Sequence, residues 1–186
     1  SVVLGVPRGG VVIAAVVCRR LGFRLDVIVA RKIGAPGNPE LAVGAVASDG
    51  TTIVEPWAAE MGLTDAYLRA EAERQIAAAR QREQALRAER QPADIAERTV
   101  VLVDDGVATG ASMHAAIQVA RARRAASIVV AVPVIVPQTA EWLAGMADEV
   151  VAAAAPTWLG AVGMAYRRFE QVGDTEVARL LSAGRE

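Results

Sequence analysis

The stretch at residues 100–113 constrains the fold of this chain more than any other. Four apolar residues that favour strands lead directly into two adjacent carboxylates, Asp104 and Asp105. A loop of small residues follows, and a helical pattern begins at Ala111. A strand, an acid pair, a loop of small residues and a helix, in this order, predict a site that holds a sugar and its phosphate together.

Strand-like and helix-like segments alternate along most of the 186 residues. Apolar residues make up 53% of the chain and aromatic residues only 4%, a composition that suits a sheet covered by closely packed helices. The alternation predicts an α/β domain with a parallel sheet, in which ligands bind beyond the carboxyl ends of the strands. The expected strands are residues 2–4, 25–30, 99–103, 127–132 and 149–154, and the expected helices are 11–21, 111–124, 137–146 and 174–181.

Three segments depart from this alternation. Residues 33–39 hold two glycines and two prolines, and so many breakers predict an irregular loop. Residues 41–54 alternate loosely and favour a hairpin around Asp49-Gly50. Residues 64–90, with Thr64 as N-cap, form the longest helical pattern, with a thin apolar stripe and charges of both signs. This mixture indicates a solvated helix that lies over the domain or packs on another subunit, rather than one that binds nucleic acid.

The overall charge and the cysteine count exclude several classes of protein. The net charge is −1 and the pI about 5.9, so the basic excess that usually accompanies nucleic-acid binding is absent. Cys18 is the single cysteine, so an internal disulfide is excluded and a cytoplasmic location is favoured. We expect its thiol to be a small side chain of the core. No apolar run reaches the roughly 18 residues of a membrane span, so no membrane partner is expected. A start within a strand, without an initiating Met, predicts that residues precede Ser1 and argues against a signal peptide.

Residues 104–112 combine two kinds of ligand-binding group. Asp104 and Asp105 can accept hydrogen bonds from vicinal hydroxyls, such as those of a ribose, or hold Mg²⁺ through oxygen. The small residues from Ala108 to Ser112 leave backbone N–H groups at a helix start open to a phosphate. The spacing of the acids and the loop fits a phosphorylated pentose. The G-x-x-x-x-G-K-[ST] motif of P-loop proteins and a G-x-G-x-x-G after the first strand are both absent.

Two further segments leave strand ends and are expected at the same edge of the sheet. Residues 6–10 form a turn into a helix, in which Gly9 and Gly10 free backbone N–H groups for a second anion and Arg8 adds charge. A tight structural turn is an equally good interpretation of these residues. Arg31-Lys32 precedes the breaker-rich loop and forms a third cationic element, unless it is a solvated pair.

Together these segments resemble the type I phosphoribosyltransferases. Residues 100–113 match the family's signature for binding phosphoribosyl pyrophosphate (PRPP), and residues 6–10 fall where the family places its pyrophosphate loop. Residues 30–34 look like the Arg-Lys element that opens the flexible catalytic loop of the adenine and orotate enzymes. The likeness is strongest to a bacterial group of unassigned substrate. It extends over nearly the whole chain, including residues 31–40 and 161–172.

The resemblance implies a parallel-sheet, Rossmann-like type I phosphoribosyltransferase fold with an inserted long helix and a small C-terminal hood. Residues 1–155 would form the core domain, with residues 64–91 as the inserted helix, and residues 156–186 the hood and a last helix. The implied enzyme is a Mg²⁺-dependent pentosyltransferase of nucleotide and nucleoside metabolism. It would transfer the 5-phosphoribosyl group from PRPP to a nucleobase-like nitrogenous base, release pyrophosphate, and act as a cytoplasmic homodimer.

The implied residue roles follow from the matched motifs. Asp104 and Asp105 would bind the ribose hydroxyls, take part in catalysis and hold the metal indirectly. Arg31 and Lys32 would neutralise the pyrophosphate during catalysis, in this site or in that of a neighbouring subunit. Trp158 would stack on the base beneath the hood. In the same way Ala108, Thr109, Gly110, Ala111 and Ser112 would cradle the 5′-phosphate, and Pro7, Arg8, Gly9 and Gly10 would line the pyrophosphate.

Two features of the sequence depart from the family pattern. The helix at residues 64–90 is outside the minimal family fold, and Ala35 stands where the adenine enzymes carry Lys.

Two alternative functions stay open. One is a regulatory domain that senses PRPP or a nucleotide without turnover, and the Arg31-Lys32 element argues against it. Another is a phosphosugar hydrolase, which would need a water-activating base that the sequence does not identify. His114 is expected at an exposed helix position, and zinc is not expected because no Cys/His cluster exists.

Overall fold

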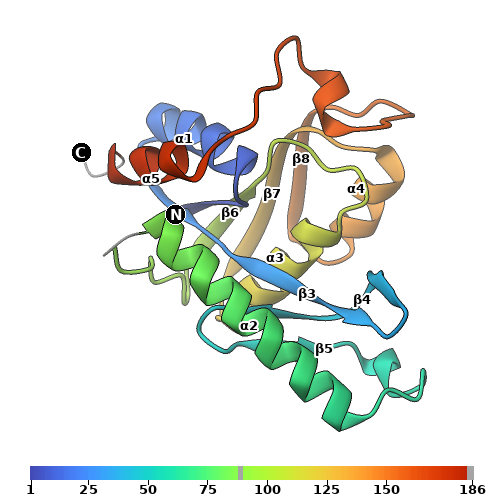
Figure 1. Ribbon diagram of the computed structural model, residues 1–186. Coiled ribbons are helices and arrows are strands. Elements are labelled where there is room, and N and C mark those ends of the chain that lie inside the picture. The colour runs from blue at the N-terminus through green and yellow to red at the C-terminus, as the bar shows by residue number, and fades with distance from the viewer. Residues whose placement is uncertain (88–89, 184–186) are drawn as a thin grey trace.

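A central parallel sheet organises the chain (Figure 1). The computed structural model describes residues 1–87 and 90–183. Five strands lie in the order β2-β1-β6-β7-β8, and each neighbouring pair is parallel. The α/β architecture predicted from the alternation of segments is therefore confirmed. The strands are β1 (Val2–Gly5), β2 (Arg24–Val27), β6 (Thr99–Val103), β7 (Ser127–Val134) and β8 (Glu149–Ala154).

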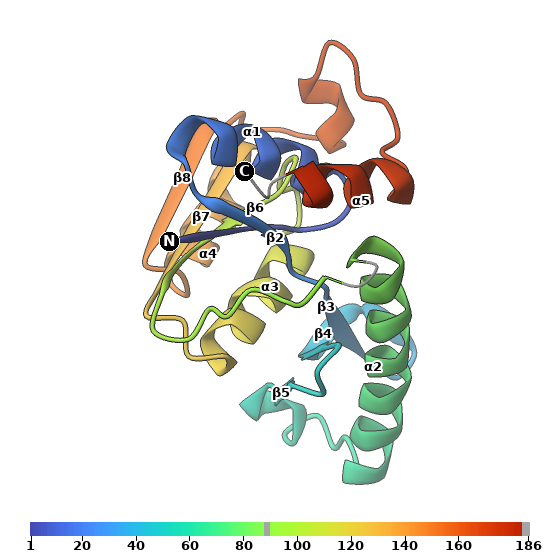
Figure 2. The ribbon, with the colours of Figure 1, turned by 90° about the vertical axis from the view of Figure 1, so that its left-hand side faces the viewer.

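Helices cover both faces of this sheet, because side chains alternate along each strand. Val2 and Leu4 of β1 face a core that contains residues of α3 and α4, whereas Val3 faces a core that contains residues of α1 and α5. Helices α1 and α5 lie side by side although they come from opposite ends of the chain (Figures 1 and 2). The helices are α1 (Gly9–Leu21), α3 (Ala111–Ala122), α4 (Pro137–Ala144) and α5 (Asp174–Ala183).

A second, antiparallel sheet is built from the segment that follows β2. Residues 33–39, expected as an irregular loop, instead form the end of β3, a tight turn and the start of β4. The breakers shape this hairpin: Gly37 has a φ of 73°, and a Cβ on Gly34 would lie 2.9 Å from the Cα of Pro39. The hairpin predicted around Asp49-Gly50 is confirmed. The elements are β3 (Ala30–Ala35), β4 (Asn38–Ala47), β5 (Thr52–Val54) and the short 3₁₀ helix η1 (Pro56–Ala58).

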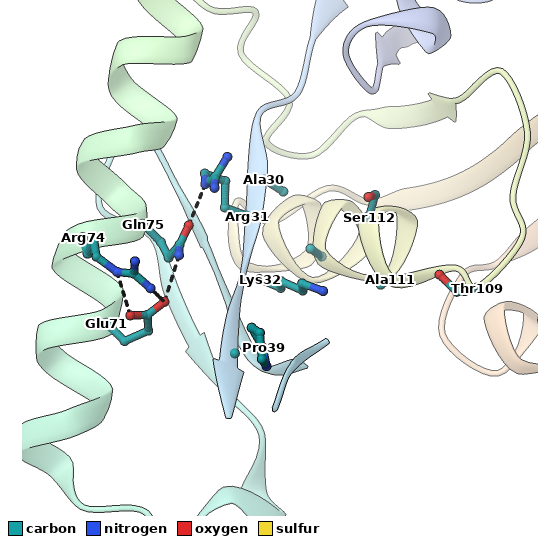
Figure 3. A pocket seen from close by; sticks show the side chains of 12 residues that line it. Ala30, Arg31, Lys32, Pro39, Glu71, Arg74, Gln75, Thr109, Ala111 and Ser112 are labelled. Atoms are coloured by element: carbon teal, nitrogen blue, oxygen red, sulfur yellow. Dashed lines mark hydrogen bonds and ion pairs between the residues drawn. The ribbon is translucent and has the colours of Figure 1, made fainter. Parts of the chain in front are cut away.

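The long charged helix α2 (Asp65–Arg87) covers this second sheet. The backbone N–H of Tyr67 donates to Oγ1 of Thr64 at 3.3 Å, as expected for an N-cap. Residues 88–89 of the predicted helix lie outside the described residues. Strand β3 passes between α2 and α3, so α2 lies over the domain (Figures 2 and 3). Within the described residues, no helix combines the length and the apolar character that crossing a membrane requires.

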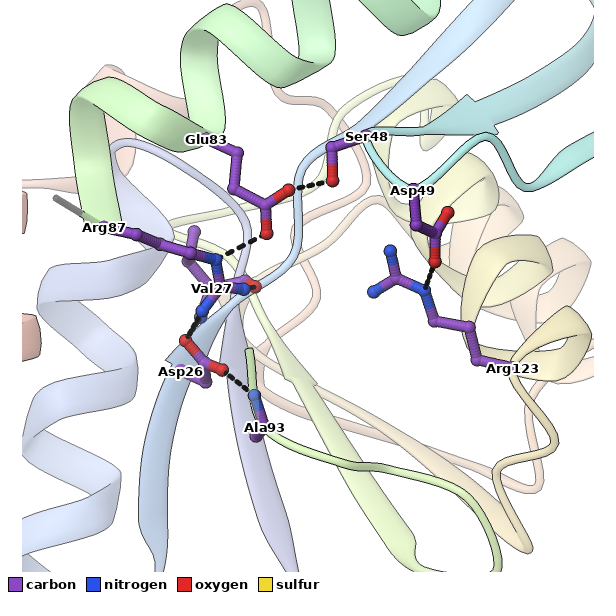
Figure 4. Close-up of polar contacts among 8 residues, drawn as sticks. All are labelled: Asp26, Val27, Ser48, Asp49, Glu83, Arg87, Ala93 and Arg123. Carbon is purple, nitrogen blue, oxygen red and sulfur yellow. Dashed lines mark hydrogen bonds and ion pairs between the residues drawn. The ribbon is translucent and has the colours of Figure 1, made fainter. Parts of the chain in front are cut away.

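A buried ion pair fastens α2 to the central sheet (Figure 4). The guanidinium of Arg87 donates to the carboxylate of Asp26 in β2, and its Nη2 also donates to the carbonyl of Val27 at 2.6 Å. Both side chains are almost fully buried, with 5% and 2% exposed. Glu83 accepts from the same guanidinium and from the hydroxyl of Ser48. Each buried charge therefore has an opposite charge and several hydrogen bonds, the condition under which burial is tolerated.

We predict that Arg87→Met lowers the free energy of unfolding by about 3–5 kcal/mol, because it leaves the buried carboxylate of Asp26 without its cation. Methionine retains an unbranched apolar stem, so most of the packing is kept. Urea unfolding of both proteins measures the difference. The matched control is Arg123→Met, which breaks the more exposed Arg123–Asp49 pair (Figure 4) and should cost at most about 1 kcal/mol. Equal losses for the two variants would contradict the assignment.

Candidate functional site

Two of the three predicted segments leave the sheet side by side. Strands β1 and β6 are parallel neighbours with Gly5 opposite Val103, so residues 6–10 and 104–112 extend from the same edge. A Cβ on Gly9 would lie 1.8 Å from Oδ2 of Asp105. The turn after β1 thus approaches the acid pair at a distance that only glycine permits. The predicted convergence of these two segments is observed.

The acid pair sits in a partly buried turn after β6. Oδ1 of Asp104 accepts a hydrogen bond from the backbone N–H of Asp105 at 2.8 Å. Burial, with the neighbouring charge of Asp105 as the second cause, raises the pKa of Asp104 to about 8. Burial also raises the pKa of Asp105. At neutral pH the pair therefore carries fewer than two negative charges, with the proton mainly on Asp104.

The loop from Ala108 to Ser112 is held from behind by α4. The hydroxyl of Thr139 donates to the carbonyl of Ala108 at 2.7 Å. Gly110 has a φ of 81°, and the ring of Trp142 fills the space where its Cβ would be. Gly110 is also the N-cap of α3, and it supplies no side-chain cap to the helix. The first N–H groups of α3 are thus presented to an external acceptor, as an anion site requires.

A hollow of about 450 Å³ opens beside this loop (Figure 3). Thr109, Ala111 and Ser112 form one wall, and the hairpin of β3 and β4 forms another. The third wall is α2, a contribution that was not predicted because the mixed charges of this helix indicated only a solvated face. The remaining residues that line the hollow are Ala30, Arg31, Lys32, Gly34, Pro39, Glu71, Arg74, Gln75 and Ala115.

Arg31 and Lys32 point to opposite sides of β3 (Figure 3). They are consecutive residues inside this strand, not the end of a strand as predicted, so their side chains alternate. Lys32 points toward α3, whereas Nε of Arg31 donates to Oε1 of Gln75 in α2 at 2.6 Å. Gln75 in turn donates to Glu71 at 2.8 Å, and Arg74 holds the same carboxylate through two hydrogen bonds. Lys32 thus lies on the side of β3 that faces α3, and Arg31 lies on the side that faces α2.

The C-terminal segment contacts the turn that carries Asp104 and Asp105, which we call the acid turn. It contains the 3₁₀ helix η2 (Val162–Ala165), and Val162 packs where a Cβ on Gly106 would lie. The hydroxyl of Tyr166 donates to the carbonyl of Asp105, a contact that the sequence pattern does not predict. Burial, followed by the charges of Asp105 and Asp104, raises the pKa of Tyr166. Tyr166 therefore remains a protonated hydrogen-bond donor at neutral pH.

Trp158 lies apart from this contact. It is 70% exposed and borders a separate apolar hollow with Pro156, Leu159 and Met164. Its predicted stacking on a base stays a prediction.

Arg8, the N-cap residue of α1, directs its side chain toward Asp174 of α5. The Pro7–Arg8 peptide bond is cis.

The expectation for His114 is wrong. Its side chain is only 14% exposed, its ring lies 5.0 Å from that of Trp142, and Nε2 is 3.4 Å from a carboxylate oxygen of Glu55. Burial lowers its pKa, with the charge of Glu55 acting in the opposite sense. His114 lies on the side of α3 that packs against Trp142 of α4, and the local sequence does not reveal this neighbour.

The acid pair could hold Mg²⁺ only together with a ligand. Within the described part of the chain, no group of three or more His, Cys, Asp or Glu side chains is arranged for a metal. Two adjacent carboxylates fit Mg²⁺ nonetheless, because this ion commonly uses one or two carboxylates along with water and substrate phosphates.

The raised pKa of Asp104 predicts a specific dependence of stability on pH. The folded state keeps the proton up to about pH 8, whereas the unfolded chain releases it near 3.8, so this contribution is complete at acidic pH and is lost as the pH rises toward 8. Asp104→Asn mimics the protonated form. We expect its free energy of unfolding, relative to the parent, to rise by more than about 1 kcal/mol between about pH 5 and about pH 8.5.

Urea unfolding at the two pH values measures this difference. Asp148→Asn is the control, because the pKa of Asp148 is lowered by the Ile128 N–H and it is ionised throughout this range. A pH-independent difference for Asp104→Asn would contradict the prediction.

Comparison with known proteins places this chain in one family. The sequence model of the phosphoribosyl transferase domain matches residues 1–151. The protein named "Putative phosphoribosyl transferase" from two strains of Mycobacterium tuberculosis is 43% identical over 181 residues, which are 97% of this chain and 41% of that protein. The crystal structure of TT1426 from Thermus thermophilus is 49% identical and superimposes with a TM-score of 0.92, covering 97% of this chain and 86% of that one. The chain therefore belongs to the phosphoribosyl transferase domain family and has the type I phosphoribosyltransferase fold.

Proposed function

We propose that this chain transfers the 5-phosphoribosyl group of PRPP to a nitrogenous base and releases pyrophosphate. The observation that carries the proposal is the position of the acid turn. Asp104 and Asp105 lie between the Gly9–Gly10 turn and the uncapped start of α3, so two anion-binding elements flank one pair of hydroxyl acceptors. PRPP has the same order of groups: a phosphate, a pentose with vicinal hydroxyls, and a pyrophosphate.

Each part of PRPP has a proposed partner in this arrangement. The 5′-phosphate accepts from the N–H groups and hydroxyls of residues 108–112. The ribose hydroxyls donate to Asp104 and Asp105, and the pyrophosphate accepts from the turn at residues 7–10. Lys32, which points to the α3 side of β3, adds positive charge near the phosphates. Residues 156–173 act as the hood for the base, and Tyr166 joins this hood to the acid turn.

The proposed reaction is a displacement at C1 of the ribose. A nitrogen of the base forms a bond to C1, the bond from C1 to the pyrophosphate oxygen breaks, and the pyrophosphate leaves with the electron pair. The transition state is oxocarbenium-like, so the protein acts by positioning the two reactants and stabilising the charge that develops. The proton that the nitrogen loses passes to the carboxylate of Asp105, because Asp104 already holds a proton up to about pH 8. Bound Mg²⁺, held through Asp104 and Asp105 together with PRPP, would supply positive charge to the leaving pyrophosphate.

A PRPP-sensing domain without turnover is the second candidate. The observation in its favour is the separation of the basic pair, since Arg31 is held by Gln75 on the α2 side of β3. The chain spans only 41% of the length of the mycobacterial relatives. The activity of the whole protein is therefore also part of the proposal. A homodimer, a cytoplasmic setting and a division into a core and a hood are parts of the proposal that the sequence alone supports.

The decisive assay is a panel of purine and pyrimidine bases with PRPP and Mg²⁺, followed by pyrophosphate release. We expect release with at least one base. Tight PRPP binding with no release for any base would favour the sensor.

The acid pair provides the accompanying variant test. At pH 7 we expect Asp105→Asn to weaken PRPP binding by about tenfold or more, because a charged hydrogen-bond acceptor is lost. Asp104→Asn should have a smaller effect at pH 7 and approach that of Asp105→Asn as the pH passes about 8, where Asp104 ionises. Calorimetry measures both, with Asp148→Asn as the exposed control. Unchanged affinity in both variants would exclude the assignment of the ribose site.

A further inference from the structure

A three-residue ion cluster joins the predicted pyrophosphate turn to the C-terminal helix. Asp174 is the first residue of α5. Its Oδ2 accepts a hydrogen bond from Nη1 of Arg82 in α2 at 2.6 Å, and its Oδ1 lies 3.7 Å from Nη1 of Arg8. The three side chains come from the turn after β1, from α2 and from α5, so this contact depends on the packing of distant parts of the chain.

The oxygen that faces Arg8 is unusual. Oδ1 of Asp174 is a buried side-chain atom without a hydrogen-bond partner among the described residues, although 39% of the side chain as a whole is exposed. A buried acceptor without a donor costs about 1–3 kcal/mol. Such atoms are therefore rare in folded proteins, and each calls for a structural or functional explanation. The guanidinium of Arg8 is close enough to fill this place after a shift of about an ångström, because hydrogen bonds of this kind span about 2.7–2.9 Å.

The cluster keeps a positive charge beside the anion turn. Two guanidinium groups share one carboxylate, so Asp174 does not neutralise both. Arg8 is the residue directly before Gly9, whose backbone lies against Asp105. The guanidinium held by Asp174 therefore belongs to a residue of the turn to which we assign the pyrophosphate.

The segment that leads to Asp174 is fixed at both of its ends. At one end Tyr166 donates to the carbonyl of Asp105, and at the other Asp174 approaches Arg8. Seven residues separate these two contacts in the sequence. The C-terminal segment thus reaches the acid pair and the pyrophosphate turn in one pass.

We propose that Asp174 is a positioning residue for Arg8. Arg82 holds one carboxylate oxygen of Asp174, and the other oxygen orients the guanidinium of Arg8 toward the pyrophosphate group of PRPP. This proposal rests on the proposed function, and it extends the pyrophosphate site to α2 and α5. It differs from a competing counter-ion, which would draw Arg8 away from the ligand and weaken binding.

The test compares ligands that occupy different ends of the site. By calorimetry with the full chain, we expect Asp174→Asn to weaken binding of Mg²⁺-PRPP and of inorganic pyrophosphate about tenfold, as loss of a charge-assisted contact implies. Binding of ribose 5-phosphate, which uses the phosphate loop, should change less than about twofold. A general structural defect would weaken all three ligands alike, and a competing counter-ion would give tighter pyrophosphate binding; either result overturns the proposal.

Further variants keep the test decisive if Asp174→Asn is unstable. Arg82→Met should give the same pattern at smaller amplitude, and Asp174→Glu should restore part of the pyrophosphate affinity. The effects of Arg8→Met and Asp174→Asn should not add in the double variant, because both act through one guanidinium. Additive effects, or no effect of Arg82→Met, would contradict the proposal.

The matched control is Asp148→Asn, because Asp148 is an exposed aspartate that pairs with Arg121 at 2.8 Å. This variant should bind all three ligands like the parent protein. Failure of the parent protein to bind PRPP would instead refute the proposed function. Parent binding that Asp174→Asn leaves unchanged would refute only the role of Asp174.

Discussion

The parallel pairing of β1 with β6 is the constraint on which the site depends. With Gly5 opposite Val103, the chain leaves both strands at the same level, and the turn at residues 6–10 meets the turn at residues 104–106. This approach requires glycine, since a Cβ on Gly9 would overlap the carboxylate of Asp105. Two segments almost a hundred residues apart in the sequence therefore form one surface, with an acid pair between two potential anion sites.

The second sheet and α2 form the outer wall of this surface. Because β3 lies between two helices, its alternating side chains serve different neighbours: Lys32 points to α3 and Arg31 to α2. The buried pair of Arg87 and Asp26 fastens the end of α2 to β2. The long helix is therefore an integral part of the structure, and its polar residues line the hollow next to the loop at residues 108–112.

The sequence predicted those parts of the fold that local pattern determines. Apolar strands, amphipathic helices and the 104–112 loop were identified because each has a characteristic period or spacing. The same reasoning failed at residues 33–39, where glycine and proline shape a hairpin instead of breaking regular structure, since partner strands override local preference. It also missed the partial burial of His114 and the contact of Asp174 with Arg8. Both depend on which helix packs alongside, and neither carries a local signal.

The charges of the site form a balance that no single segment determines. The proposed ligand carries several phosphates and needs more positive than negative charge around it, yet the acid pair lies at the centre of the proposed site and Arg31 is hydrogen-bonded to Gln75 of α2. Burial reduces the opposing charge by keeping a proton on Asp104 up to about pH 8. In the proposed function, attraction comes from the start of α3, from Lys32 and from the Arg8–Asp174–Arg82 cluster, which carries one excess positive charge. If the proposed function holds, the fold combines hydroxyl acceptors with anion binding because packing, rather than additional basic residues, sets the charge of its carboxylates.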